Sequence, residues 1–253
     1  QTMIILVLPA YNEAPNLARL LPRVREIRDT LTVPIRVLLV DDGSTDGTAE
    51  AARQAAGDLP LEVVTHPANQ GLAATIKTGF SSALARATAD DDIIVTMDAD
   101  DTHSPSLIPR MAGLVFEGHD LVVASRFTPG ARVSGLSLPR QIYSLVAAWM
   151  FRAVAPIRGV RDYTCGYRAY RVGFLRRVWD IYGEAITTET GFSCMSDILL
   201  RCREFDPVAA EVPLDLRYER KEGTSKMRVW RNISDTLRLL ARALMRGRRC
   251  KAR

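Results

Sequence analysis

Three carboxylates follow a short apolar run in the segment DDIIVTMDADDTHSP, which covers residues 91–105. Residues 93–97 are typical of a buried strand, and Asp98, Asp100 and Asp101 come directly after them. If the strand continues, alternation places Asp98 and Asp100 on one side of the chain. Two carboxylates held together repel each other unless a cation lies between them. Oxygen ligands of this kind suit Mg²⁺ or Mn²⁺, which keep several waters and bridge to substrate phosphates.

Three earlier apolar runs also end in polar residues. They end in PAYNE at 9–13, DDGSTDGT at 41–48 and HPANQGLAATIKTGF at 66–80. Gly43 and Gly47 permit tight turns, and the carboxylates beside them can accept hydrogen bonds from a ribose or a base. Ligands of a parallel sheet bind beyond the carboxyl ends of its strands. Each motif alone is also typical of an ordinary acidic turn, but the four together favour a site for a nucleoside diphosphate.

The elements that position these motifs alternate along the first half of the chain. The predicted strands are 4–8, 35–40, 61–65, 93–97 and 121–124, and the predicted helices are 12–28, 48–56, 72–86 and 107–116. Continuous apolar strands separated by helices predict an α/β fold, with a mostly parallel sheet covered by helices on both faces.

The pattern changes after Arg126. Residues 126–140 are loop-like, an apolar and aromatic helical stretch runs to about residue 154, and a turn is expected around 158–170. We predict one catalytic domain at 1–230, which includes acceptor or interface helices at about 138–157. A basic amphipathic tail at 231–253 completes the chain.

Composition excludes several classes of protein. The 253 residues carry a net charge of +5 and are 47% apolar, enough for a substantial core. The four cysteines form no CxxC pair, which indicates reduced thiols rather than a zinc site or a disulfide framework. No signal peptide and no apolar run of about twenty residues is visible. The basic tail suits an anionic surface such as lipid headgroups, or is simply a solvated helix end.

The ordered strand-end motifs PAYNE, VDDGSTDGT, NQGLAATIKTGF and MDADDTHSP resemble those of family 2 glycosyltransferases of the GT-A (Rossmann-like) fold. Later segments resemble the polyprenyl-phosphate branch, typified by dolichol-phosphate mannose synthases. These segments are SRF at 125–127, DYTCGYRAY at 162–170, ETGFSCMSDILLR at 189–201, EVPL at 211–214 and ERKEGTSKM at 219–227. The resemblance extends from about Ile4 to Leu240.

The resemblance implies roles for the matching residues of the strand ends. The nucleotide sugar would be held by Pro9, Tyr11, Glu13, Asp41, Asp42, Lys77 and Asp98. The cofactor, Mg²⁺ or Mn²⁺, would be held by Asp98, Asp100 and Thr102. The family pattern DADLQH has Gln at the place of Thr102, so the shorter hydroxyl must ligate the ion directly or through water.

The resemblance also implies a set of catalytic residues and an acceptor site. The catalytic candidates are Asp100, Arg126, Asp197, Arg220 and Lys226. The acceptor phosphate would meet Arg126 and Arg140, since arginine binds phosphate in a bidentate geometry. Ordinary surface charge is the alternative for these basic residues.

The implied reaction is metal-dependent, inverting transfer of a hexose to a polyprenyl phosphate. Mannose is favoured over glucose, and GDP-mannose is the favoured donor. A lipid monophosphate is already an anion near neutral pH, because its second pKa is about 6, so it needs little or no general base. An alcohol acceptor would need one. Asp197 is the candidate for that base, or it helps to cap or solvate a helix.

Other functions stay open at this point. A GT-A enzyme that glycosylates a soluble hydroxyl acceptor, in cell-wall or secondary metabolism, is the main alternative. A catalytically idle nucleotide-sugar-binding module is disfavoured by the intact Asp98 and Asp100. A nucleic-acid partner is disfavoured because no recognition motif accompanies the basic residues. The stretch 141–157 is either a core helix or an interface helix, and the latter predicts a peripheral enzyme on the cytoplasmic face of the membrane. The oligomeric state is not indicated.

Overall fold

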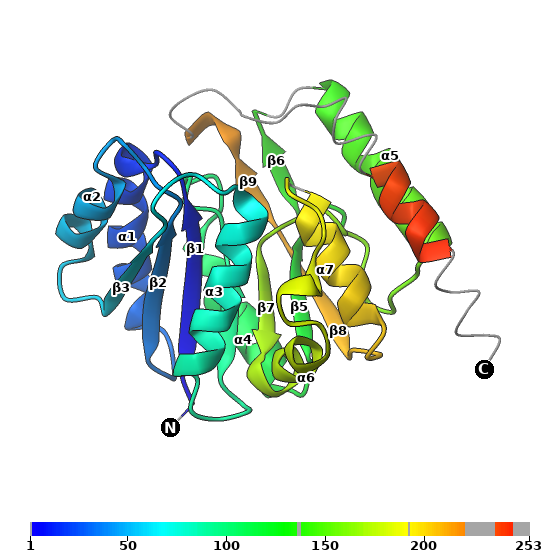
Figure 1. Ribbon diagram of the computed structural model, residues 1–253, viewed down its shortest axis with the longest axis horizontal. Helices are drawn as coiled ribbons and strands as arrows, with labels where there is room; N and C mark the ends of the chain where they lie inside the picture. The colour runs from blue at the N-terminus through cyan, green and yellow to red at the C-terminus, as the bar shows by residue number, and fades with distance from the viewer. Residues whose placement is uncertain (1, 136–137, 192, 221–235, 245–253) are drawn as a thin grey trace.

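A seven-stranded sheet forms the centre of the computed structural model, which describes residues 2–135, 138–191, 193–220 and 236–244 (Figure 1). The strands follow the order β3-β2-β1-β4-β7-β5-β8 across the sheet. Their bounds are β1 Ile4–Ala10, β2 Ile35–Asp41, β3 Leu61–Thr65, β4 Ile93–Thr96, β5 Leu121–Ser125, β7 Arg168–Arg171 and β8 Ala209–Pro213. Strands β6 Arg132–Ser134 and β9 Asp215–Arg217 pair in a separate two-stranded sheet.

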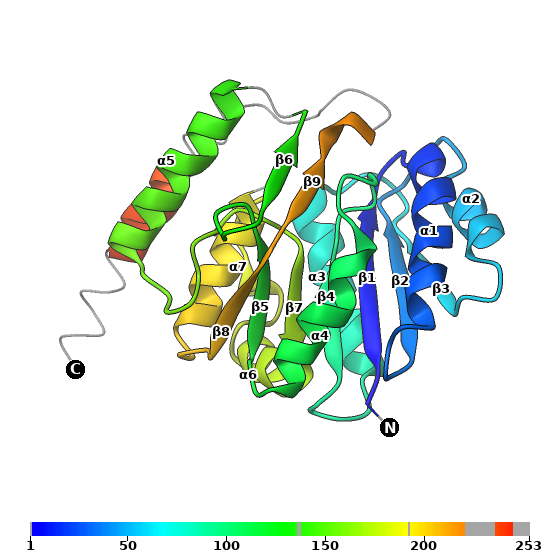
Figure 2. The same ribbon diagram turned by 180° about the vertical axis from the view of Figure 1, so that it is seen from behind.

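Helices cover both faces of the main sheet, with α1 and α4 on one face and α3 and α7 on the other (Figures 1 and 2). The helices are α1 Ala14–Arg28, α2 Thr48–Ala56, α3 Leu72–Arg86, α4 Ile108–Phe116, α5 Leu138–Val154, α6 Val172–Tyr182 and α7 Ser193–Arg203. Short 3₁₀ turns lie at Pro105–Leu107, Gly183–Ile186 and Tyr218–Arg220. Because both faces are covered, β4 and β5 are buried at every position, and this explains why each is apolar up to its last residue.

The sheet is parallel except for β7, which runs antiparallel to both neighbours. Ala169 is the register partner of Val95 on β4 and of Val122 on β5. Our prediction of a turn around 158–170 was therefore wrong at its end, where a central strand begins. The strand was missed because it is four residues long and begins and ends with arginine. Arg168 is nevertheless fully buried, a result of tertiary packing that the local sequence does not reveal.

The predicted strands and helices of the first half are confirmed, with small shifts at their ends. Helix α1 begins at Ala14 rather than at residue 12, because Asn12 has a φ of 55°, which a helix cannot contain. Strand β4 ends at Thr96 and the chain then bends, so the alternation argument for Asp98 and Asp100 was wrong. Their relative placement comes from the loop instead.

Helix α5 and the helical residues 236–244 lie side by side at one edge of the molecule (Figures 1 and 2). The latter stretch is the described part of the predicted basic tail. The predicted domain boundary at residue 230 lies outside the described residues. None of the helices in the described ranges combines the length and the apolar character that crossing a membrane requires.

Candidate active site

The loop after β4 holds the two carboxylates expected to bind a metal. Asp98 and Asp100 are half-buried. The Asp100 Oδ1 atom accepts hydrogen bonds from Thr102 N at 3.2 Å and from Thr102 Oγ1 at 2.6 Å. Thr102 therefore fixes the orientation of the Asp100 carboxylate. Its direct ligation of a metal stays a prediction.

The loops after β1 and β2 interlock beside this carboxylate loop. Asn12 N donates to Ser44 Oγ at 2.9 Å, and Thr45 N donates back to Asn12 Oδ1 at 2.9 Å. Asp41 is buried at the end of β2, and its Oδ1 accepts from Ser44 N at 3.1 Å. These reciprocal bonds hold the two strand ends together at the carboxyl edge of the sheet.

Several predicted nucleotide-binding residues lie around the interlocked loops. Pro9 and Tyr11 are half-buried at the end of β1, and Glu13 accepts from Asn16 Nδ2 at 2.6 Å through its Oε2. Lys77 is half-buried on α3. The structure thus brings the predicted residues at the ends of β1 and β2 to one edge of the sheet, where Asp42 N donates to Ala10 O at 2.9 Å, whereas Lys77 lies within α3.

Asp42 has a different environment from the one expected of a ligand residue. Its buried carboxylate accepts from Gln70 N at 2.9 Å and Gly71 N at 2.8 Å, and lies 2.7 Å from His66 Nδ1. The carboxylate therefore secures the loop between β3 and α3. This geometry favours a positioning role for Asp42, whereas direct contact with a nucleotide stays a prediction.

The acidic loop fits a cation that arrives with its substrate. Within the described ranges, no cluster of three or more His, Cys, Asp or Glu side chains is arranged to hold a metal ion. A protein cage for Ca²⁺ or Zn²⁺ is therefore not formed by these residues. Two carboxylates at a strand end match Mg²⁺ or Mn²⁺ sites, where waters and substrate phosphates complete the coordination.

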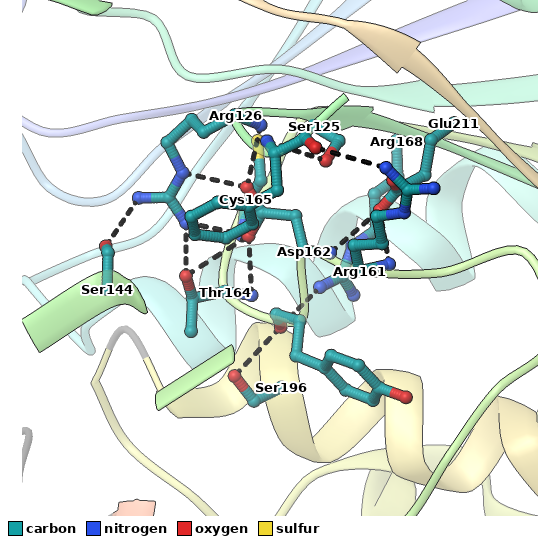
Figure 3. Close-up of polar contacts among 12 residues, drawn as sticks. Ser125, Arg126, Ser144, Arg161, Asp162, Thr164, Cys165, Arg168, Ser196 and Glu211 are labelled. Carbon is teal, nitrogen blue, oxygen red and sulfur yellow. Dashed lines mark hydrogen bonds and ion pairs between the residues drawn. The ribbon is translucent and has the colours of Figure 1, made fainter. Parts of the chain in front are cut away.

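Arg126 follows β5 and pairs with Asp162 (Figure 3). Its Nε and Nη2 atoms donate to Asp162 Oδ2 and Oδ1 at 2.8 and 2.7 Å, its Nη1 donates to Ser144 Oγ at 2.9 Å, and Nη2 also contacts Thr164 Oγ1. The Asp162 side chain is 0% exposed and that of Arg126 is 15% exposed. Most of the guanidinium is thus occupied by protein partners, although Ser144 brings α5 directly beside it.

Electrostatics keep this pair ionised despite its burial. Burial alone would raise the pKa of Asp162, but the charge and hydrogen bonds of Arg126 lower that pKa below its ordinary value. Burial alone would likewise lower the pKa of Arg126, but Asp162 raises it above its ordinary value. Glu211 on β8 supports the same turn, since its Oε1 accepts from Arg161 N at 2.6 Å and Asp162 N at 2.7 Å.

Asp197 lies in the first turns of α7 and is 2% exposed. Its Oδ2 accepts from Thr187 Oγ1 at 3.1 Å and from Thr188 N at 3.0 Å, and Oδ1 lies 3.9 Å from Arg201 Nε. The carboxylate therefore holds the loop before α7. This favours the structural interpretation over a base that takes a proton from an acceptor.

The remaining predicted basic residues are only partly placed. Arg140 belongs to α5, four residues before Ser144, and Arg220 ends the 3₁₀ turn after β9. Lys226 lies outside the described residues. The three described cysteines are free and buried, and burial raises each pKa to about 12, so the thiols stay protonated near neutral pH.

Sequence reasoning missed several residues of the site. His103 is 5% exposed, stacks on Tyr167 with ring centroids 5.2 Å apart, and places its Nδ1 3.9 Å from Asp98 Oδ2. Its position inside DADDTH was the available signal. Asp162 and Ser144 were also missed, because their importance depends on contacts with Arg126 from distant parts of the chain.

A pocket of about 650 Å³ lies near the C-terminal end of α5. Its lining includes Trp149, Arg152, Pro156, Arg161 and Glu211, and none of the predicted donor-site residues. It is therefore separate from the acidic loop, but it shares Arg161 and Glu211 with the turn that carries Asp162.

A sequence model of the family described as glycosyl transferase family 2 matches residues 5–179. The chain belongs to this family. It is therefore a glycosyltransferase, as the strand-end motifs predicted. Polyprenol monophosphomannose synthase of Mycolicibacterium smegmatis is 32% identical to this glycosyltransferase over 251 residues, which cover 98% of the chain and 89% of the relative. Undecaprenyl-phosphate mannosyltransferase of Micrococcus luteus is 34% identical over 226 residues, with coverages of 88% and 87%.

Solved structures of the same fold add a comparison at low sequence identity. Glucosyl-3-phosphoglycerate synthase of Mycobacterium tuberculosis, in complex with Mn²⁺, UDP and glucosyl-3-phosphoglycerate, superposes with a TM-score of 0.65. It is 20% identical, and the match covers 97% of this glycosyltransferase and 80% of that chain. The predicted GT-A fold is confirmed. That neighbour was also solved with Mg²⁺ and UDP, so divalent cations accompany the nucleotide in a protein of this fold.

Proposed function

We propose that this glycosyltransferase moves mannose from GDP-mannose to a polyprenyl phosphate at a membrane surface, with inversion at the sugar and with Mg²⁺ or Mn²⁺. Support for the sugar and the acceptor comes from the two relatives whose names specify mannosyl transfer to a polyprenyl acceptor. Glucose is the second candidate sugar, and GDP as the nucleotide rests on the family resemblance alone.

The donor binds at the carboxyl edge of β1, β2 and β4 in this proposal. Asp98 and Asp100 would hold the cation, which would supply positive charge that neutralises the departing nucleoside diphosphate. Thr102 keeps the Asp100 carboxylate in one orientation through its two hydrogen bonds. The interlocked loops at Asn12 and Ser44 supply a fixed wall for the nucleoside.

The acceptor side rests on one observation, the two different faces of α5. One face carries buried Ser144, which accepts a hydrogen bond from Arg126. The other face exposes apolar side chains at helical spacing, namely Leu138 (67%), Ile142 (54%), Leu145 (60%), Val146 (49%) and Trp149 (68%). We call these five residues the α5 stripe. An apolar face of this kind, with arginines on the same helix, suits the membrane interface where a polyprenyl chain is anchored.

The reaction is an in-line displacement. An oxygen of the acceptor phosphate attacks the anomeric carbon while the bond to the nucleoside diphosphate breaks, so an α-linked donor gives a β-linked product. The acceptor oxygen is already anionic and no proton has to be removed. Asp197 is therefore not needed as a base, in keeping with its bonds to Thr187 and Thr188.

The proposed location is peripheral, on the cytoplasmic face of the membrane. The α5 stripe supplies apolar contact, and exposed Arg152 supplies positive charge from the same helix. A combination of apolar area and basic charge gives reversible attachment to anionic lipid.

The test is release of nucleoside diphosphate by the purified protein. GDP-mannose, UDP-glucose and UDP-N-acetylglucosamine would be offered in turn with Mg²⁺ or Mn²⁺, each with and without a short polyprenyl phosphate. We expect release only with GDP-mannose and the lipid phosphate together. Asp100→Asn should reduce it at least about 100-fold, since the main charge-stabilising group is weakened.

Asp91→Asn is the matched control, because Asp91 is an exposed acid just before β4, at the opposite end of the strand from Asp98. It should leave release unchanged. Release that ignores lipid phosphate and responds to a soluble alcohol would contradict the proposal. In that case the hydroxyl-acceptor alternative would take its place, and Asp197→Asn would be the next variant.

A further inference from the structure

The third acid of the loop after β4 is Asp101, which is buried. Its φ of 58° lies in the left-handed region, which Asp tolerates better than most residues. The side chain is 4% exposed and forms ion pairs with two arginines of α1. Arg23 Nη1 contacts Asp101 Oδ1, and Arg19 Nε lies 3.8 Å from Oδ2.

Arg23 spans the loop rather than a single residue. Its Nη2 also donates to Ser104 Oγ at 3.3 Å. On the other side of the loop, Arg217 N on β9 donates to Thr102 O at 3.0 Å, and Tyr167 donates to Ser104 O at 3.0 Å. Residues 101–104 are thus held by contacts from α1, from Tyr167 just before β7, and from β9.

A second chain of contacts runs along α1 toward the β1 end. Arg19 Nη2 donates to Asn16 Oδ1 at 2.8 Å, and Asn16 Nδ2 donates to Glu13 Oε2 at 2.6 Å. Glu13 is one of the residues expected to meet the nucleoside. One polar edge of α1 therefore connects the β1 loop to the carboxylate loop after β4.

Charge explains why the arginines matter. An unpaired carboxylate one residue from Asp100 would add to the repulsion between Asp98 and Asp100 and offer a competing ligand for the cation. The two arginines neutralise Asp101 and turn it toward α1. We propose that the Arg23–Asp101 pair, supported by Arg19, is a positioning device that sets the Asp98–Asp100 loop before cation and diphosphate bind. This inference rests on the proposed metal-dependent function.

The test compares three variants with one control. Asp101→Asn keeps the size and the tolerance of a positive φ but removes the charge. Arg23→Gln removes the positive charge of the guanidinium. Arg23→Lys keeps a positive charge but cannot contact Asp101 and Ser104 through two separate nitrogens. Arg28→Gln is the matched control, since Arg28 is also on α1 and donates to Asp58 at 2.9 Å, but far along the helix from the acidic loop.

Two readouts are independent of turnover. Binding of Mn²⁺ in the presence of GDP or UDP is followed by the loss of the free-ion electron paramagnetic resonance signal. We expect about 10- to 100-fold weaker Mn²⁺ binding in Asp101→Asn and Arg23→Gln, the usual effect of losing a group that orients metal ligands. Arg23→Lys should recover part of the affinity, and Arg28→Gln should match the wild type. Amide hydrogen exchange of residues 98–107 in metal-free protein should also accelerate only in the first two variants.

The double variant Arg23→Gln/Asp101→Asn distinguishes a positioning role of the pair from the effect of leaving the Asp101 carboxylate without its counter-charge. It leaves no unpaired carboxylate, so it should fold like the wild type yet still bind Mn²⁺ weakly. Wild-type affinity in the double variant, or an equal loss in Arg28→Gln, would overturn the positioning role alone. A wild-type protein that binds no Mn²⁺ with any nucleotide would overturn the proposed function, and the positioning role with it.

Discussion

Asp42 and Asp162 are both buried carboxylates that hold a loop, but they are neutralised in different ways. Asp42 is 2% exposed and is surrounded by backbone N–H groups of residues 70–71 and by His66. Asp162 is 0% exposed and also accepts from backbone N–H groups, those of Arg126, Thr164 and Cys165, but its counter-charge is the guanidinium of Arg126. Losing the Asp162 charge would therefore leave a mostly buried arginine unpaired, whereas no arginine or lysine pairs with Asp42 among the contacts of the described residues. The turn beside α5 is thus the more sensitive of the two to the loss of one charge.

The same two regions differ in how completely the protein covers its own apolar surface. The face of α1 that meets the sheet is fully buried, with Leu17, Leu20 and Leu21 each 0% exposed. Helix α5 instead leaves the α5 stripe uncovered. Large exposed apolar patches mark interaction surfaces. We infer that the donor side is complete by itself, while the α5 side is completed by an apolar partner, for which we propose the membrane.

The largest effect should come from Asp162→Asn. This change leaves the mostly buried Arg126 without a counter-charge, and such a loss costs about 3–5 kcal/mol in the free energy of unfolding. Urea denaturation measures it. Asp215→Asn is the control, because its partner Arg217 forms a pair in which both side chains are 36–41% exposed, and a surface pair contributes about 0–1 kcal/mol. Equal losses in the two variants would contradict the comparison.

The difference in the free energy of unfolding between the wild type and Asp162→Asn should depend on pH in a defined direction. The pKa of Asp162 is lowered in the folded protein from an ordinary value of 3.8. Its stabilising contribution is therefore complete above pH 3.8 and is lost as the pH falls through the lower, folded pKa. We expect the gap between the wild type and Asp162→Asn to be constant near neutral pH and to narrow only in acid below 3.8.

Asp42→Asn should have a smaller effect on stability. The change leaves no arginine unpaired. The new amide N–H₂ group would, however, face a backbone N–H group that donates to a carboxylate oxygen in the wild type, and this loss costs about 1–3 kcal/mol in the free energy of unfolding. Because the loop of residues 66–71 would lose its anchor, the KM for the donor should also rise while kcat changes less. Urea denaturation and donor titration check the two parts. A loss of stability as large as that of Asp162→Asn would break the comparison with which we began.

Trp149→Ser tests the α5 side without touching the fold. Trp149 is 68% exposed, so the melting temperature should stay within about a degree of the wild type, as for most surface changes. Sedimentation with anionic vesicles should weaken by about 10- to 100-fold, the equivalent of 1.5–3 kcal/mol for burying one large side chain.

Phe116→Ser on α4 is the matched control for that experiment, since Phe116 is 45% exposed on a helix that covers the sheet. It should not change vesicle binding. If both variants lose binding equally, or neither does, the α5 stripe is not the membrane-facing surface. Transfer to a short, water-soluble acceptor phosphate should be the same in both variants.

The local sequence predicted the elements that are buried because their own residues are mostly apolar. The strand at Ile4–Ala10 is an unbroken apolar run and the strand at Leu121–Ser125 is apolar up to its last residue, so their place in a covered sheet could be predicted. Strand Arg168–Arg171 could not, because its arginines are accommodated by neighbouring elements, including the Met195 carbonyl that accepts from Arg168 at 2.6 Å. Long-range packing overrode the local pattern there.

The site shows the same division. Asp98, Asp100, Asp41 and Asp42 could be located because strand ends converge at one edge of a parallel sheet. The long-range ion pairs around the site could not be predicted, since their two members come from different elements. The pairing of Asp101 with Arg23 crosses 78 residues, and that of Arg126 with Asp162 crosses 36. Only the tertiary structure distinguishes an acid that faces a ligand from an acid that holds a loop.

The smallest expected effect concerns a contact between the α5 side and the proposed donor side of the molecule. Arg242, in the helical stretch beside α5, donates to Glu189 Oε1 at 2.7 Å and to Thr188 Oγ1 at 3.1 Å. Asp197 holds the same loop at Thr188, and Thr190 O lies close to Gly71, where an added Cβ would be 3.3 Å away. The helical residues 236–244 beside α5 are thus connected, through residues 188–190, to the loop that Asp42 anchors.

Arg242→Gln should cost at most about 1 kcal/mol in the free energy of unfolding, because the arginine is 45% exposed and its pair is partly screened by solvent. If the contact transmits the position of these helices to the loop at Gly71, the donor KM should rise about two- to threefold only when vesicles are present. Arg238→Gln, one turn earlier on the same helical stretch, is the control and should give no vesicle-dependent change. A donor KM that is unaffected by vesicles in Arg242→Gln would mean that the α5 side and the donor side work independently. The two sides would then differ in their packing and charge pairing, with no functional coupling between them.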